Sequence, residues 1–109
     1  MGRAILLNAL PVTALPTPIT LRIEEISAMQ LQQIVSQYRE IVNYIRHEST
    51  VRLLNQLLGV NLQPGGGLYR YEAGDQLIVV VLRSPQRGQQ DVSVTLEDIA
   101  IYRVDVISQ

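Results

Sequence analysis

The apolar run from Leu77 to Leu82 constrains the fold of this chain more than any other segment. Every residue in the run is apolar, and its centre is β-branched. Continuous apolar strands lie inside sheets that are covered on both faces, whereas half-exposed strands alternate apolar and polar residues. The run therefore predicts a central strand of a sheet against which helices pack.

Shorter patterns predict the other strands. Residues 19–24 alternate apolar and polar, as expected of a half-buried strand, and further strands are expected over 3–8, 68–72 and 99–107. Residues 39–46 are compatible with either a helical face or an extended piece. We expect an α/β fold with a mixed sheet of about five strands flanked by helices, in a single domain spanning 1–109.

Helical periodicity is clearest over residues 48–58. Leucines at 53, 54, 57 and 58 form one apolar stripe, and Gly59 is well placed to end the helix in a left-handed conformation. An earlier helix is expected to begin at Ser27, a favoured N-cap residue, and to extend to about residue 38.

The charge of the chain narrows its possible partners. Charged residues make up 17% of the sequence, below the roughly 25% of typical globular domains, so a neutral or apolar surface that favours a homodimer is expected. The net charge of −1 argues against binding duplex nucleic acid, which needs a basic surface. Nine arginines and no lysine leave a small anionic ligand as an option, because arginine contacts phosphate in a planar, bidentate way.

Other features bear on cofactors and location. The chain has no cysteine and one histidine, a composition that supplies neither a thiolate site nor a multi-histidine zinc site, so we expect no metal and no cofactor. No apolar run approaches the ~18 residues of a membrane span, and the apolar stretch after Met1 is too short for a secretory signal. A cytoplasmic protein without a membrane partner is expected.

His47 is the first candidate for proton transfer. Histidine is the residue type whose ordinary pKa lies closest to neutrality, and this is the only one in the chain. It stands just before the expected helix 48–58, where unpaired N–H groups and the positive end of the helix dipole favour a phosphate. A histidine that only caps the helix is the alternative interpretation.

Two loops are further candidates for ligand contacts. Arg83 and Arg87 flank the loop after the central strand, a position where α/β proteins commonly bind ligands. Asn8 and Ala9 lie where the first strand ends.

Other segments are not expected to bind a ligand. The turn Gln63–Gly67 is not a phosphate-binding loop, because no Lys-Ser/Thr pair follows it. The adjacent acidic pairs are expected to be solvated: Glu24 with Glu25, and Glu97 with Asp98.

Together these segments resemble the viral anti-CRISPR ring nucleases and their cellular relatives, a family first seen as small orphan proteins of archaeal viruses. The resemblance covers nearly the whole chain. It rests most on His47-Glu48-Ser49-Thr50 and on the leucines, Asn55 and Gly59 that follow. Leu7-Asn8-Ala9, Gly74-Asp75, and an Arg-x-Pro loop from Arg83 to Gly88 support it.

The resemblance implies a metal-independent enzyme that cleaves cyclic tetra-adenylate, the second messenger of type III CRISPR defence. It implies linear di-adenylate with a 2′,3′-cyclic phosphate as product, and a homodimer with the ring bound across its two-fold axis. The ribose 2′-hydroxyl attacks its own phosphate, His47 protonates the 5′-oxygen and Arg83 stabilises the developing charge. The expected substrate-binding residues are Asn8, Ala9, Arg46, Ser49, Thr50, Gln86 and Arg87.

Among the departures of the chain from the family pattern, two bear most directly on catalysis. Arg46 stands where the family usually has glycine, so it adds a phosphate contact or crowds the site. The loop after the central strand is one residue longer and lacks the usual glutamate, so Arg87 is an alternative to Arg83 as the catalytic arginine. A non-catalytic protein that binds the same ring, and a small dimeric interaction protein without a nucleotide ligand, are the alternative functions.

Overall fold

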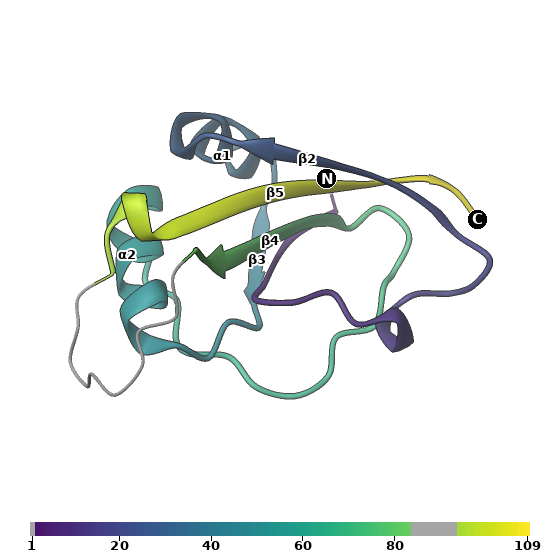
Figure 1. Cartoon of the computed structure of the whole chain (residues 1–109), viewed down its shortest axis with the longest axis horizontal. Coiled ribbons are helices and arrows are strands. Elements are labelled where there is room, and N and C mark those ends of the chain that lie inside the picture. Colours follow the sequence, from purple (N-terminus) through teal and green to yellow (C-terminus); the bar gives the residue numbers. More distant parts are fainter. Residues whose placement is uncertain (1, 84–93) are drawn as a thin grey trace.

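A computed structural model describes residues 2–83 and 94–109 of the chain. Five strands form one sheet in the order β2-β5-β4-β1-β3 (Figure 1). Strand β1 is parallel to β3 and β4, whereas β5 is antiparallel to both β4 and β2. The strands are β1 (Arg3–Leu7), β2 (Thr20–Ile26), β3 (Glu40–Asn43), β4 (Gln76–Leu82) and β5 (Ile99–Ser108).

The expected α/β fold with a five-stranded mixed sheet is confirmed. The apolar run from Leu77 to Leu82 falls within β4, which lies in the middle of the sheet between β5 and β1. The helices are α1 (Ala28–Val35) and α2 (Glu48–Leu58), with short 3-10 helices η1 (Val12–Ala14) and η2 (Leu96–Asp98). Neither α-helix in the described part of the chain has the length and apolar character to span a membrane.

Both α-helices cover one face of the sheet. Alternate residues of β1 and β4 point into this layer, where they pack with buried residues of both helices, such as Leu31 and Leu54. The intervening residues, such as Ile5 and Leu77, point to the opposite face, which is covered by η1 and by the segment around Tyr69. We call these the helix face and the loop face.

The prediction of a strand over 68–72 is wrong. The structure instead forms β3 within residues 39–46, the region that is compatible with either a helix or an extended piece. In the 68–72 segment Tyr69 is buried and Leu68 is 87% exposed, so the alternation is real. It arises because the segment crosses the loop face, where one backbone bond joins Tyr71 N–H to the Ala14 carbonyl. Alternating burial alone does not make a β-strand, because a strand also needs a ladder of backbone hydrogen bonds to a neighbouring strand.

The helix boundaries follow local capping. Ser27 caps α1 in a capping box with Gln30, as expected of an N-cap serine. However, α1 ends at Val35 rather than at about residue 38, because the chain turns at Ser36 and then enters β3. Helix α2 has the predicted bounds and ends at Gly59, whose φ of 68° is the left-handed conformation that glycine adopts without strain.

Candidate functional site

Three predicted site segments meet at one edge of the sheet. Because β1, β3 and β4 are mutually parallel, their carboxyl ends lie at the same edge. Asn8 follows β1, the segment 44–47 follows β3, and Arg83 follows β4. In α/β sheets, ligands bind outside the carboxyl ends of the strands. The topology therefore places the candidate residues where this fold class binds ligands.

His47 is the N-cap of α2. Its Nδ1 accepts a hydrogen bond from the backbone N–H of Thr50 at 3.3 Å and lies 3.0 Å from the Thr50 hydroxyl oxygen. The side chain is exposed, and Nε2 has no hydrogen-bond partner among the described residues. The capping interpretation and the catalytic interpretation are thus compatible, because each uses a different ring nitrogen. Serine, threonine, aspartate and asparagine are the favoured N-cap residues, so helix capping alone does not explain a histidine at this position.

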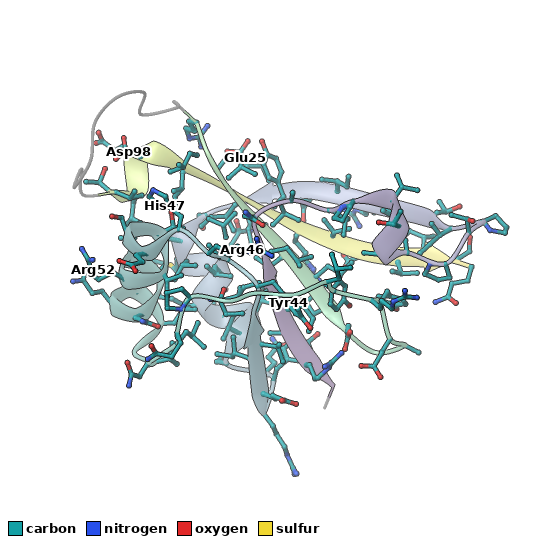
Figure 2. All side chains as sticks on the ribbon, turned by 90° about the horizontal axis from the view of Figure 1, so that it is seen from below. Glu25, Tyr44, Arg46, His47, Arg52 and Asp98 are labelled. Atoms are coloured by element: carbon teal, nitrogen blue, oxygen red, sulfur yellow. The ribbon has the colours of Figure 1, made fainter. Side chains whose placement is uncertain are left out.

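The segment that carries His47 is organised by Asn43, which the sequence analysis did not identify. The Asn43 side chain accepts from the Ile45 N–H at 3.0 Å and donates to the carbonyls of Ile45 and Gln63 at 3.1 and 2.8 Å. Gly65 N–H donates to the Ile45 carbonyl, and a Cβ on Gly65 would collide with the backbone of Asn43. These contacts fix the path of the chain between β3 and α2. Tyr44, Arg46 and His47 lie along this path (Figure 2).

A pocket of about 330 Å³ lies beside this segment on the loop face. It brings together three of the predicted substrate-binding residues, Asn8, Ala9 and Arg46. Arg70, Tyr44 and Thr13 also line it and add a second guanidinium and two hydroxyl groups. No local pattern predicts a role for Arg70, because its proximity to Arg46 depends on how the 68–72 segment crosses the sheet.

The wall of this pocket is anchored by an ionic network. The Tyr69 ring packs edge-on against Tyr44, with centroids 5.3 Å apart, and its hydroxyl donates to Asp75 at 2.6 Å. Arg3 forms a bidentate pair with Asp75 at 3.0 and 2.8 Å and also contacts Glu72. The Asp75 side chain is 3% exposed. The network joins the start of β1 to the segment that forms the pocket wall.

Burial and hydrogen bonding shift the pKa values in this network. Burial acts to raise the pKa of Asp75, but hydrogen bonds from Arg3, Tyr69 and the Glu72 N–H outweigh it, so the pKa is lowered. Burial, followed by the hydrogen bond to Asp75, raises the pKa of the Tyr69 hydroxyl above its usual range. The hydrogen bond to Asp75 also raises the pKa of Arg3. All three groups are therefore held in their neutral-pH charge states.

Neither His47 nor the Ser49 and Thr50 that follow it line this pocket. Thr50 is buried, 3% exposed, and its hydroxyl lies under His47. Ser49 lines a separate hollow of about 90 Å³ along α2 with Arg52 and Val94. Their direct contact with a substrate stays a prediction.

Arg83 forms hydrogen bonds to residues of β5 and β2. Its Nη2 donates to Glu25 at the end of β2 at 2.8 Å, and its Nε donates to the Ile99 carbonyl at 2.9 Å. Glu25 is exposed to solvent, as expected, and its carboxylate also accepts from this guanidinium. Asp98 likewise accepts from the N–H and hydroxyl of Thr95. The predicted contacts Gln86 and Arg87 lie outside the described residues.

A metal centre is not evident in the part of the chain that the structure describes. There, no three His, Cys, Asp or Glu side chains come together in a way that could hold an ion.

A family model matches residues 4–106, almost the whole chain. The chain belongs to the STIV B116-like family. Among solved structures it is similar to B116 of Sulfolobus turreted icosahedral virus, with a TM-score of 0.74 and 22% sequence identity. This match covers 94% of the chain and 98% of B116. No curated protein matches the chain.

Membership of the STIV B116-like family confirms the relation to small proteins of archaeal viruses. The identity to B116 is low enough that this likeness shows the fold alone. The B116-like fold accounts for the parallel arrangement of β1, β3 and β4, and hence for the edge at which His47 and Arg46 lie.

Proposed function

We propose that this protein is a metal-independent ring nuclease that cleaves cyclic tetra-adenylate and so switches off type III CRISPR signalling. The observation that carries the proposal is His47, an exposed histidine that directly follows Arg46 of the pocket and whose Nε2 has no hydrogen-bond partner among residues 2–83 and 94–109. Membership of the B116-like family and the motif resemblance support it. The expected products are linear di-adenylates that end in a 2′,3′-cyclic phosphate.

The chemistry requires a proton donor and a group that stabilises anionic charge. The ribose 2′-oxygen forms a bond to the adjacent phosphorus, the bond from phosphorus to the 5′-oxygen breaks, and the 2′-hydroxyl proton passes to solvent. His47 delivers the Nε2 proton to the departing 5′-oxygen. Arginine stabilises the charge on the phosphoryl oxygens, and Arg46 is the guanidinium adjacent to His47 in the chain, with Arg70 lining the same pocket. Arg83 acts in this role when it is released from Glu25.

The proposal includes a homodimer. An apolar patch lies on the part of the loop face that η1 and the Tyr69 segment, among the described residues, leave open. It is formed by β2, β4 and β5 and shares Asn8 and Ala9 with the pocket. Its apolar members are Leu10, Ile23, Val79, Val81, Tyr102 and Val104. A second copy seated on this patch brings two pockets together. A ring of four identical nucleotides has two-fold symmetry, so two copies of His47 act on opposite phosphates.

A non-catalytic protein that binds the ring is the second candidate. The pairing of Arg83 with Glu25 favours it, because the expected catalytic arginine is occupied by a carboxylate. Such a protein holds cyclic tetra-adenylate in the pocket and leaves it intact. An interaction protein without a nucleotide ligand is the third candidate.

Incubation with cyclic tetra-adenylate in the presence of EDTA, followed by chromatography of the products, separates these candidates. We expect linear di-adenylate with a cyclic phosphate from the wild type and an intact ring with His47→Ala. Arg22→Ala is a control, because Arg22 is exposed and pairs only with Glu24 in the described structure. Tight binding without turnover over hours at stoichiometric concentration supports the second candidate, and no binding supports the third.

A further inference from the structure

The Thr50 side chain contacts the ring of His47, the proposed general acid. Its hydroxyl oxygen lies 3.0 Å from His47 Nδ1, and its own backbone N–H donates to the same nitrogen at 3.3 Å. Thr50 is 3% exposed, whereas His47 is exposed. The buried hydroxyl thus has a fixed position on α2, and the exposed imidazole of His47 contacts it through Nδ1.

The two groups that contact Nδ1 differ in what they can do. A backbone N–H only donates, whereas a hydroxyl both donates and accepts. In neutral His47 with the proton on Nε2, Nδ1 accepts from both groups. In the imidazolium, Nδ1 carries a proton, and the Thr50 oxygen is the acceptor within reach. The backbone N–H of Thr50 then faces an N–H group and cannot donate to it.

We propose that Thr50 is a positioning residue, whose hydroxyl reverses its hydrogen bond to keep His47 seated on α2 in both protonation states. The catalytic part of this inference rests on the proposed ring-nuclease function. During cleavage, the Nε2–H bond of the imidazolium breaks, the proton passes to the 5′-oxygen, and the electron pair stays on Nε2. The remaining Nδ1–H is held by the Thr50 oxygen until solvent returns a proton to the ring.

Substitutions at Thr50 do not change the charged groups that surround His47. Arg46 and Glu48 flank His47 in the chain, and Arg83, already paired with Glu25, lies at the same edge of the sheet. The remaining charged groups of the adjoining elements are Arg52 on α2, Arg70 in the pocket wall, and Glu97 and Asp98 on η2. None of them is altered by Thr50→Val, which removes one hydroxyl and keeps the shape of the side chain.

The test uses the fact that the chain has one histidine. In protein labelled with ¹⁵N at the imidazole, NMR reports one pair of ring nitrogens across a pH titration. We expect the neutral wild-type ring to carry its proton on Nε2. In acid, the imidazolium Nδ1–H is expected to exchange slowly with water in the wild type and fast in Thr50→Val, because the charged ring loses its acceptor. Thr50→Ser, which keeps the hydroxyl, is expected to match the wild type.

The activity arm follows cleavage of cyclic tetra-adenylate as a function of pH. With Thr50→Val the cleavage rate is expected to fall about tenfold, and Thr50→Ser is expected to restore it. A neutral wild-type ring protonated on Nδ1, or equal exchange rates of the imidazolium Nδ1–H in all three proteins, overturns the inference. If no protein cleaves the ring, the proposed function fails, while the NMR titration still decides the role of Thr50.

Discussion

The guanidinium of Arg83 and the carboxylate of Glu25 lie 2.8 Å apart at the edge of the sheet that carries the candidate site. This pair joins the end of β4 to the end of β2 across the intervening β5, where Arg83 also donates to the Ile99 carbonyl. Both side chains are about half exposed. A phosphate that approaches Arg83 therefore competes with a carboxylate that already occupies it.

Replacing Glu25 with Gln is expected to strengthen binding of cyclic tetra-adenylate. The change frees the Arg83 guanidinium and removes a negative charge near the phosphates. Because exposed ion pairs contribute at most about 1 kcal/mol, the expected decrease in Kd is about two- to fivefold, measured by calorimetry with His47→Ala protein. Glu24→Gln removes the same charge from the neighbouring residue and is expected to leave Kd unchanged. An equal effect of both substitutions would show that only net charge matters.

Replacing His47 with Asn separates its two roles. Asparagine is a favoured N-cap, so this variant is expected to be at least as stable as the wild type, whereas His47→Ala loses about 1 kcal/mol of unfolding free energy. Neither residue can donate the proton, and cleavage is expected to fall about 10²- to 10⁴-fold in both. Thermal unfolding and product chromatography measure the two effects. Substantial cleavage by the stable Asn variant contradicts a general-acid role for His47.

Replacing Arg46 with Ala is expected to weaken ring binding. Arg46 lines the pocket, and a charge-assisted contact with a phosphate is worth enough to change Kd about tenfold. Calorimetry at two salt concentrations checks this, because loss of a phosphate contact also lowers the salt dependence. Arg22→Ala is the matched exposed control. Tighter binding by Arg46→Ala would show instead that the arginine crowds the site.

The apolar patch on the loop face predicts a dimer that a single charge disrupts. Ile23 is 62% exposed and lies on this patch, so Ile23→Asp is expected to shift sedimentation from dimer to monomer and to abolish cleavage. Ile107 is similarly exposed, at 59%, but lies near the end of β5 outside the patch, so Ile107→Asp is the control. A wild type that sediments as a monomer at micromolar concentration contradicts the dimer.

The Arg3–Asp75–Tyr69 network predicts a specific loss of stability in acid. The pKa of Asp75 is lower in the folded protein than in the unfolded chain, so its contribution is present above about pH 4 and is lost as the pH falls through the folded value. Asp75→Asn is expected to lower the unfolding free energy by about 1–3 kcal/mol at neutral pH and to flatten its decline in acid. Urea unfolding from neutral pH to about pH 3 measures both effects. Parallel curves for the two proteins would contradict this account.

Local signals were sufficient for several parts of the fold. The apolar run of β4, the stripe and glycine end of α2, and the cap at Ser27 each depend on residues close in sequence, and each is confirmed. His47 at the start of α2 follows from the same local pattern. These features are predictable because helix capping and side-chain periodicity act over a few residues.

Tertiary contacts decided the rest. Residues 40–43 form a strand because β1 offers them a parallel partner, while 68–72, with the better alternation, only crosses the loop face. The pairing of Arg83 with Glu25 joins residues 58 positions apart. The sequence by itself thus determined the central strand, the start of both helices and the position of His47. The structure decided which strands pair, which guanidinium is free and what walls the pocket has, because these depend on contacts between distant residues that no local periodicity encodes.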